Sequence, residues 1–306
     1  VYGASSLTDV RIYNNTSNHT AGGLYIENGR DGTFTNLKIY NNTCEINCRG
    51  ISIQIQSANN IKLSNVLIHG NSGKYGSGSF GGTAVLFLAN STADLANATI
   101  TKNDSLHGVA RTVQGTLNLS NSIIWDNTSN ALANTVNVSH SILQGSGGSG
   151  AWKNGYGVNK GGNLDIDPQF VNPSEGDFRI EVNSPAVDQG DDSFNPPAID
   201  LVGNPRKVGT IDIGAYEVRV EDFVQAAAAD LEIRYAAGDS DASVTQDVLL
   251  PDSGVGGTSI SWTSSNPEVI ESDGTVIRPH SSSTDAVVTL TATISKDGVS
   301  DSKIFV

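Results

Sequence analysis

Residues 34–42 read Phe34-Thr-Asn36-Leu-Lys-Ile39-Tyr-Asn-Asn42, and variants of this motif recur through the first half of the chain. Each variant follows the pattern apolar-x-Asn-x-x-Ile-x-x-Asn. Five clear copies end at Asn15, Asn42, Asn71, Asn103 and Asn127, and a weaker sixth copy ends at Ser146. A repeat of roughly 20–30 residues is typical of a solenoid, whose repeats stack on one another.

The runs between the copies have the period of β-strands. In residues 50–56, Ile51, Ile53 and Ile55 alternate with polar side chains, and a period of two indicates a strand with one buried face. We therefore expect each repeat to supply short strands. A single coil cannot bury its apolar face alone, so the coils are expected to stack around a continuous core of Ile, Leu, Val and Phe.

Two positions of the repeat are filled by short polar side chains. The third position holds Asp9, Asn36, Asn65, Asn97, Asn121 and His140, and the ninth holds the five asparagines that end the copies. Asn tolerates the left-handed backbone of a sharp bend, and stacked amides can donate and accept along a column. We expect two asparagine ladders at two corners of a parallel β-helix. Simple surface polarity would not place Asn in register in five copies.

The composition excludes some classes of protein. The 306 residues carry 18 basic and 32 acidic side chains, a net charge of −14, distributed as +3 in residues 1–162, −7 in 163–220 and −10 in 221–306. No apolar run is long enough to span a membrane, and without basic blocks we expect no nucleic-acid partner. One explanation of the negative charge is that an acidic surface keeps a secreted protein soluble. The alternative explanation is that the carboxylates of residues 163–220 bind a divalent cation.

The asparagine positions and the repeated Ile-x-x-Asn motif resemble those of the right-handed parallel β-helix family of secreted and surface proteins. The resemblance covers residues 1–162 and implies an all-β solenoid there. Because this scaffold hosts pectate lyases, polygalacturonases, adhesins and passenger domains alike, the resemblance implies no single activity.

A Gly-rich loop, residues 145–162, is expected to be flexible and precedes an ordered series of motifs. The series reads Asp167-Pro-Gln-Phe170, Gly176-Asp-Phe-Arg-Ile180, Ser184-Pro-Ala-Val-Asp-Gln-Gly190, Asp200-Leu-Val-Gly-Asn-Pro-Arg206 and Asp212-Ile-Gly-Ala-Tyr-Glu217. It resembles the C-terminal end module of bacterial surface β-helix proteins, which implies an irregular acidic cap over residues 163–220. Val202 stands where that module commonly has an acidic residue, which weakens the case for a metal.

The cap is expected to cover the open end of the helix, because its prolines cannot donate hydrogen bonds to a further strand. Its carboxylates have two candidate roles: capping turns, with salt bridges to Arg179 and Arg206, or ligating Ca²⁺ through oxygen. The side chains concerned are Asp165, Asp167, Asp188, Asp191, Asp200 and Asp212.

Residues 221–306 are predicted to form a small immunoglobulin-like β-sandwich. A short Ala-rich helix over 220–230 leads into it as a semi-rigid connector, and strand-like runs separated by turn motifs follow at 231–235, 248–250, 259–262, 276–277, 287–294 and 303–306. The stretch from Ile260 to Pro279 resembles bacterial immunoglobulin-like domains, which are modules of extracellular enzymes and surface proteins. Trp262 is expected to lie in the core rather than to serve as a platform for sugar stacking.

The two cysteines, Cys44 and Cys48, lie between two coils. With no further Cys and no nearby His pair, they do not form a four-ligand zinc site. In an oxidising compartment we expect a small loop disulfide between them, with free thiols as the alternative.

A search for catalytic residues finds no convergent pair. A glycosidase needs two carboxylates across the scissile bond, and in the repeats only Glu27 lies clearly on a strand, with Gln54 and Gln56 one coil further on. A polysaccharide lyase needs a base, for which the candidates are Tyr25 and Arg111 on strands and Lys74 and Tyr75 in a loop. We assign no catalytic residue. The candidate ligand-binding residues are Tyr25, Glu27, Gln54, Gln56 and Arg111.

These observations predict an extracellular or cell-surface protein, bacterial in origin, with a structural or adhesive role and no catalytic site of its own. We expect the chain to be a fragment of a longer protein. The alternative is a carbohydrate-active protein, either a polysaccharide lyase, a glycoside hydrolase or a glycan-binding β-helix, with the immunoglobulin-like domain as accessory. Expected partners are a polysaccharide, a cell-surface molecule or further copies of the chain, and the one candidate cofactor is Ca²⁺.

Overall fold

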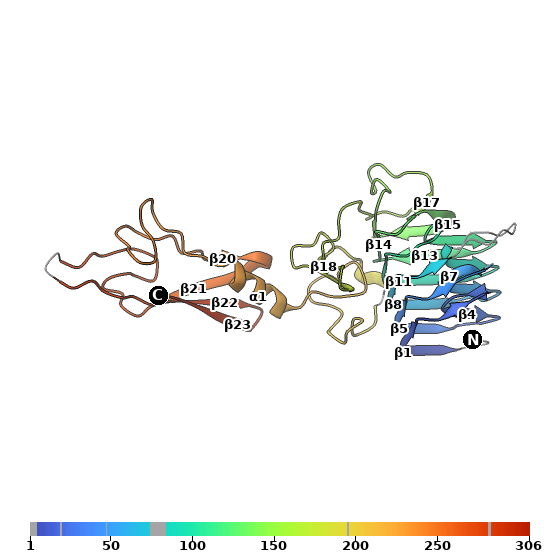
Figure 1. Cartoon of the computed structure of the whole chain (residues 1–306), viewed down its shortest axis with the longest axis horizontal. Coiled ribbons are helices and arrows are strands. Elements are labelled where there is room, and N and C mark those ends of the chain that lie inside the picture. Colours follow the sequence, from blue (N-terminus) through green and yellow to red (C-terminus); the bar gives the residue numbers. More distant parts are fainter. Residues whose placement is uncertain (1–4, 19, 47, 74–83, 195, 281–282) are drawn as a thin grey trace. The chain divides into compact units, whose positions relative to one another are not determined.

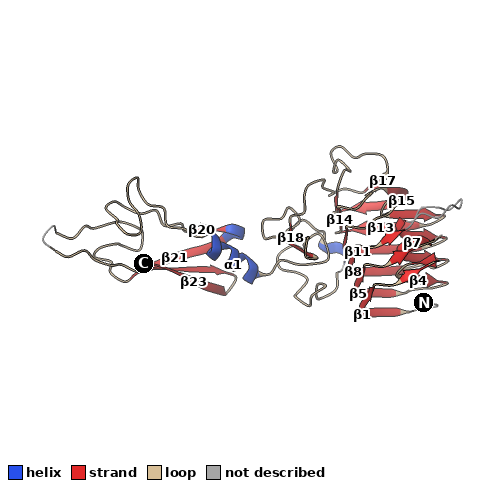
Figure 2. Cartoon of the chain, viewed as in Figure 1, coloured by secondary structure: helices blue, strands red, loops and turns tan. Residues whose placement is uncertain are grey.

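The computed structural model describes residues 5–18, 20–46, 48–73, 84–194, 196–280 and 283–306. The chain divides into two compact units, Val1–Glu217 and Val218–Val306, which are described separately. Strands dominate the first half of the chain, and the single α-helix of the described residues belongs to the second unit (Figure 2). No helix in these ranges is long and apolar enough to cross a membrane.

The first unit is built on a parallel β-helix, as predicted. One face of the stack consists of β1 (Ser6–Tyr13), β5 (Thr33–Tyr40), β8 (Ile61–His69), β11 (Thr92–Thr101), β13 (Thr116–Ser120), β14 (Ile123–Trp125), β15 (Leu132–Ser139) and β16 (Ile142–Leu143) (Figure 1). A second face consists of β3 (Thr20–Ala21), β4 (Leu24–Glu27), β7 (Cys48–Gln56), β10 (Ala84–Ala89) and β12 (Ala110–Val113), and β15 begins on this face, where Leu132 pairs with Ala110. The strand β17 (Tyr156–Asn159) pairs along β15 and follows it across both faces. The short strands β2 (Thr16–Ser17), β6 (Thr43–Cys44) and β9 (Ser72–Gly73) form the third.

The register of the parallel strands stacks like residues above like. Ile12 lies opposite Ile39, Ile39 opposite Ile68, Ile68 opposite Ile100 and Ile100 opposite Ile124. Four of these five isoleucines have no exposed surface, and Ile12 in the first coil is partly buried. The stack therefore buries one continuous apolar column, which no single coil could bury.

The ninth position of the repeat forms a continuous asparagine ladder. Its amides donate from Nδ2 of one Asn to Oδ1 of the next, with distances of 2.9 Å from Asn15 to Asn42, 2.9 Å from Asn42 to Asn71, 2.9 Å from Asn71 to Asn103 and 3.0 Å from Asn103 to Asn127. Each Oδ1 also accepts the backbone N–H of the Asn in the coil before it. Asn42 and Asn71 are fully buried, so the ladder satisfies polar groups that water cannot reach.

The left-handed residue at this corner precedes the ladder residue. Asn14, Asn41, Gly70, Lys102 and Asp126 all have positive φ, from 52 to 62°. The prediction that the ladder asparagines themselves would be left-handed is wrong for this corner. The bend is made by the neighbouring residue, which leaves the ladder amide free to point along the stack.

At the third position of the repeat, all six residues are left-handed, with φ from 42° at His140 to 58° at Asp9. Here the amides link only the first coils: Asn36 donates to Asp9 (2.8 Å) and Asn65 donates to Asn36 (2.9 Å). Asn121 instead bonds the backbone of Asp191. The first coils therefore form a short side-chain ladder at this corner, whereas Asn121 in a later coil binds the backbone of the segment 163–217.

The Gly-rich loop is part of the stack. Its β17 pairs in parallel with β15, and Trp152 and Tyr156 pack against the core. The indole N–H of Trp152 donates to the carbonyl of Gly157 at 3.0 Å. We expected this loop to be flexible, but its two aromatic rings and its strand build it into the last coils.

The acidic segment lies along the flank of the stack, not across its end. Its structure is irregular apart from β18 (Phe170–Asn172), β19 (Asp177–Ile180) and the 3₁₀ turn η1 (Asp192–Phe194). Phe178, Leu201 and Tyr216 pack on Leu67, an outward-facing residue of β8, and the backbone of Ala215 donates to Thr99 of β11. The outward apolar residues of the coils thus give this segment a lateral binding surface.

The second unit contains a four-stranded antiparallel sheet with one helix packed on it. The strands are β20 (Ser253–Gly254), β21 (Thr258–Ser264), β22 (Leu290–Lys296) and β23 (Val299–Phe305), with the 3₁₀ turn η2 (Val255–Gly257) between the first two. The helix α1 (Val220–Asp230) occupies the residues predicted to be helical. It is not a free connector, because Phe223, Val224 and Ala227 are buried, the last two in one cluster with sheet residues.

The second layer of the expected sandwich is largely irregular. The runs at 231–235, 248–250 and 276–277 form only isolated bridges, Arg234 with Leu249 and Ile270 with Val276. Trp262 lies in the core, where its indole N–H donates to the carbonyl of Pro251 at 2.8 Å and its ring lies 5.4 Å from that of Phe305. The layer beneath the sheet is therefore held by side-chain packing more than by strand pairing.

The asparagine ladder yields a stability prediction. Asn71→Ala should lower the free energy of unfolding by at least about 2 kcal/mol, because it leaves two buried donors of Asn42 without their acceptor. Urea unfolding followed by circular dichroism measures the loss. Asn118→Ala is the matched control, since Asn118 sits in an exposed amide column with Asp94 and should change stability by no more than about 0.5 kcal/mol. Equal losses in the two variants would contradict the role of the buried ladder.

Candidate functional site

The register of the second face brings the predicted ligand-binding residues together. Tyr25 of β4 lies opposite Gln54 of β7, Gln54 opposite Phe87 of β10, and Phe87 opposite Arg111 of β12. Glu27 and Gln56 form the neighbouring pair, two residues further along the same strands. Since Ile53 and Ile55 point into the core, these side chains lie on the outer surface of the sheet.

This outer face combines aromatic rings, amides and cations. Phe87 and Gln54 are 6% and 2% exposed, so they form its floor, and the guanidinium carbon of Arg49 lies 5.8 Å from the Phe87 ring. Gln54 donates to Gln56 at 3.3 Å, and its Oε1 is buried without a described partner. Tyr25, Glu27, Gln56 and Arg111 are half-buried and reach solvent.

The side chains of this face can be compared with what sugar chemistry requires. Glu27 is the single carboxylate among the residues that the register aligns there, so the face lacks the paired carboxylates of glycoside hydrolysis. Aromatic, amide and guanidinium groups recognise sugar C–H faces, hydroxyls and carboxylates respectively. Lys74 and Tyr75, the loop candidates for a base, lie outside the described residues.

Two contributors to the face were missed by sequence reasoning. Phe87 lies in an all-apolar run, which predicts a core residue. In the structure its neighbours Leu86 and Leu88 belong to the core, whereas the side chain of Phe87 points to the outer surface. The all-apolar run gives no alternation that would have marked Phe87, and the register shift between Ala84 and Leu86 puts both Val85 and Leu86 in the core. Arg49 begins β7 beside the cysteine loop, and its place over Phe87 becomes visible only once the strand register is known.

The six aspartates proposed as calcium ligands all accept backbone N–H groups, some within a turn and some from segments 18 to 24 residues away in the sequence. Asp165 accepts from Gly145 (2.8 Å) and Gly147 (2.7 Å), and Asp200 accepts from Val202 and Asn204, both at 2.9 Å. The other four aspartates accept a backbone N–H each: Asp167 accepts that of Gln169, Asp188 that of Thr210, Asp191 that of Ser193 and Asp212 that of Asp188. Across the described ranges, no three acidic, His or Cys side chains form a group that could hold a metal.

A buried ion-pair cluster joins the turns of the acidic segment. Arg206 is 1% exposed and donates from Nη2 to the carbonyls of Asp212 (2.9 Å) and Gly214 (2.7 Å). Its Nε lies 3.9 Å from Glu217, which accepts the backbone N–H groups of Val208 and Asp212 at 3.1 Å each. Burial, reinforced by the Asp212 carboxylate, raises the pKa of Glu217 to about 8. This cluster fixes the segment's fold and faces no solvent.

Cys44 and Cys48 are joined by a disulfide that spans four residues. Both cysteines have no exposed surface and belong to the core of the coils. The bond therefore closes the chain at the start of β7, next to Arg49 on the binding face.

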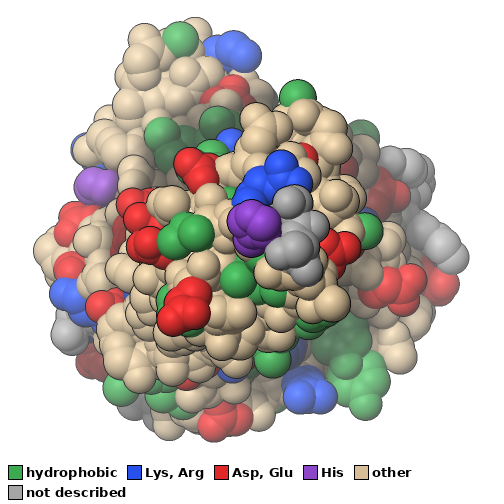
Figure 3. All heavy atoms as spheres, turned by 90° about the vertical axis from the view of Figure 1, so that its left-hand side faces the viewer, with side chains coloured by type: hydrophobic (Ala, Val, Ile, Leu, Met, Phe, Trp, Pro, Cys, Tyr) green, Lys and Arg blue, Asp and Glu red, His purple; other side chains and the backbone are tan. Residues whose placement is uncertain are grey.

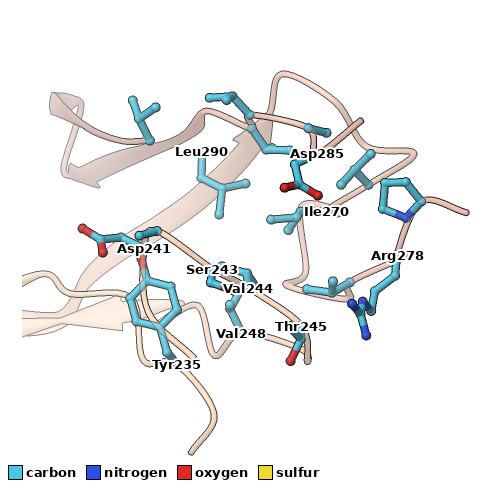
Figure 4. A pocket seen from close by; sticks show the side chains of 18 of the residues that line it. Tyr235, Asp241, Ser243, Val244, Thr245, Val248, Ile270, Arg278, Asp285 and Leu290 are labelled. Atoms are coloured by element: carbon cyan, nitrogen blue, oxygen red, sulfur yellow. The ribbon is translucent and has the colours of Figure 1, made fainter. Parts of the chain in front are cut away.

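The second unit contains a hollow of about 670 Å³ between the sheet and the irregular layer. Figure 4 shows Leu290, Ile270 and Val248 in it, with Tyr235 and Asp241 on one side and Arg278 and Asp285 on the other. Its walls combine apolar residues of the core with polar and charged residues such as Asp241, Arg278 and Asp285. The face in Figure 3 carries scattered acidic and apolar side chains and, among the residues described, no extensive basic patch.

Comparison with known proteins bears on the second unit. Residues 224–306 match the family described as an atrophied bacterial Ig domain, which fits a sheet whose second layer is reduced. No curated protein matches the chain. The crystal structure of pectate lyase Pel9A is similar at 14% identity and a TM-score of 0.40, covering 71% of this chain and 68% of that chain. The β-helix assignment rests on the strand register and not on this similarity.

The hydrogen bonds of the aspartates predict the response to calcium. Titration with calcium chloride after chelator treatment should leave the melting temperature unchanged, because the carboxylates already accept backbone N–H groups. Differential scanning fluorimetry provides the measurement. A rise with calcium but not with magnesium, lost in Asp200→Asn, would contradict the turn-capping role.

The buried Glu217 predicts a pH dependence of stability. Its folded-state pKa, about 8, lies above that of the unfolded chain, so its contribution is present at low pH and is lost as pH rises from about 5 to about 8. Relative to Glu217→Gln, the parent protein should lose stability across that range, measured by urea unfolding at several pH values. The exposed Glu175→Gln variant, as the control, should follow the parent protein. Parallel profiles for all three would refute the assignment.

Proposed function

We propose that this protein is an extracellular or cell-surface adhesive protein that holds a polysaccharide against the outer face of β4, β7, β10 and β12. The observation that carries the proposal is the column Tyr25–Gln54–Phe87–Arg111, one residue from each coil. Adjacent coils lie about 4.8 Å apart. Groups at that regular spacing suit a chain of repeating units better than a compact small molecule.

Each part of the column has a role in this proposal. Tyr25 offers an apolar ring edge and a hydroxyl, Gln56 offers an amide, and Arg111 offers a planar cation that pairs with carboxylates. Phe87 is too buried to contact a polymer, so it supports the guanidinium of Arg49 from below. The face therefore favours an acidic polysaccharide over a neutral one.

The extracellular location has two supports. Disulfides such as Cys44–Cys48 persist in oxidising compartments and are rare in the cytosol. The bacterial Ig family matched by residues 224–306 is typical of modules in surface and secreted proteins. In this proposal the second unit presents the β-helix to its partner.

The binding proposal is tested with polygalacturonate and a neutral glucan. The protein should bind polygalacturonate in isothermal titration, and Arg111→Gln should weaken binding about tenfold, the loss of one charged hydrogen bond. Lys62→Gln is the matched control, because this exposed lysine lies on β8 of the other face.

Two outcomes would overturn the proposal. The first is the absence of binding to any acidic or neutral polysaccharide. The second is the release of unsaturated products from polygalacturonate with the parent protein and their loss with Arg111→Gln, which would make the protein a polysaccharide lyase with Arg111 in the reaction.

A further inference from the structure

One outward column of the first face changes character halfway up the stack. The strand register aligns Arg11, Lys38, Leu67, Thr99 and Ile123. The acidic segment covers the upper part, where Leu67 packs on Phe178 and Leu201 and Thr99 accepts the N–H of Ala215. The two lowest residues, both cationic, lie beyond that cover.

A cleft of about 320 Å³ opens between these two cations and the loop at residues 199–203. Arg11 and Lys38 line one side, and Ile199 and Val202 line the other and are 42% and 49% exposed. Such a volume is at the lower end of ligand pockets, the size of one or two sugar rings. The cleft therefore combines a cationic wall with an apolar wall.

The two cations form no ion pair in the cleft, and the carboxylates of Asp9 and Asp200, which also line it, offset only part of their charge. Arg11 and Lys38 sit on adjacent strands about 4.8 Å apart, and neither forms an ion pair with a residue in the described part of the chain. Burial and the charge of Arg11 lower the pKa of Lys38, although Asp200 opposes that effect. An unpaired pair of like charges in a half-enclosed site is stabilised by any anion that binds both.

The nearby carboxylates are engaged elsewhere. Asp200 is fully buried and accepts three backbone N–H groups, those of Val202, Asn204 and Glu217. Asp9 accepts the amide of Asn36 at 2.8 Å at the rim. Each carboxylate keeps its charge but is held by these hydrogen bonds and forms no ion pair with Arg11 or Lys38, so both cationic groups stay open to a ligand.

We propose that this cleft binds the carboxylate of a small hydroxylated acid, of the size of one acidic sugar, on Arg11 and Lys38. The guanidinium of Arg11 takes the carboxylate in a two-bonded fork, and Lys38 supplies a second charge. Ile199 and Val202 cover the carbon skeleton, and the carboxylate oxygen of Asp9 that does not bond Asn36 suits a hydroxyl donor at the rim.

The aromatic rings beside the cleft act as a support. Tyr13 and Tyr40 lie two residues beyond the cations on the same outer face and stack at 4.9 Å, and Tyr40 stacks on His69 at 5.1 Å. Because each stacked ring covers the face of its neighbour, a ligand could reach only the ring edges and the outer face of Tyr13. The stack therefore holds β1 and β5 together below the cleft, which fixes the spacing of the two cations.

This site is independent of the proposed polysaccharide face. It lies on the first face, built from β1 and β5, whereas Arg111 lies on β12 of the second. A failure of one proposal therefore leaves the other standing, and the two are separated by which arginine matters.

Titration calorimetry with D-glucuronate, D-glucose and sulfate tests the cleft. Glucuronate should bind, glucose should not, and Arg11→Gln or Lys38→Gln should each weaken glucuronate binding at least fivefold. Lys62→Gln is the control and should leave glucuronate binding unchanged, because this exposed lysine lines neither the cleft nor the proposed polysaccharide face. Lys38→Gln removes a like-charge contact, so its melting temperature should equal or exceed that of the parent protein, and Lys38→Arg should retain binding.

Three results would overturn the proposal. They are no glucuronate binding by the parent protein, unchanged binding in both cleft variants at native melting temperature, and sulfate binding as tight as glucuronate. The last would mean that the cleft selects bare oxyanions and not an acid with a sugar-sized body.

Discussion

The amide ladder from Asn15 to Asn127 is the constraint on which the first unit depends. Along the ladder, each amide donates to the Asn of the next coil and accepts from the Asn of the coil before it. These bonds require the equivalent residue of every coil to lie directly above that of the coil before, which fixes the strand register. A slip of one residue in any strand would exchange its inward and outward faces. Because the corner is buried, such a slip would also leave donors without acceptors, which makes the register an all-or-none property.

Because the register is fixed, outward-facing residues of successive coils line up in columns. The columns on the two faces have different roles. On the first face, Leu67 and Thr99 form a surface that the acidic segment covers, with Asn65 and Asn121 bonding its backbone at Ile199 and Asp191. On the second face, Tyr25, Glu27, Gln56 and Arg111 reach solvent above the buried side chains of Gln54 and Phe87. One flank is thus used for internal packing, while the other keeps groups that reach solvent.

The parts of this structure that follow a period were predictable, and the parts that depend on a distant partner were not. The repeat located the buried ladder and the isoleucine columns, because inward positions recur in every copy. It did not reveal that residues 163–217 lie along the flank, since Leu67 looks like any other apolar residue until Phe178 and Leu201 are placed on it. The Arg11–Lys38 pair was visible as Arg-Ile-Tyr and Lys-Ile-Tyr in successive copies. The sequence does not show that the acidic segment stops packing on the coils at Leu67 and leaves a cleft beside Arg11 and Lys38.

The charges of the two parts of the first unit do not cancel at their junction. The coils are slightly positive and the segment beside them is strongly negative, yet the segment directs Asp200, Asp212 and Glu217 inward to its own backbone and to Arg206. Buried carboxylates bonded to backbone N–H groups stabilise turns, and of these Asp200 also offsets part of the charge at Lys38. Because no ion pair from the described residues reaches Arg11 or Lys38, these coil cations keep part of their positive field where the acidic segment ends. An overall charge of −14 is in this way compatible with local sites that attract anions.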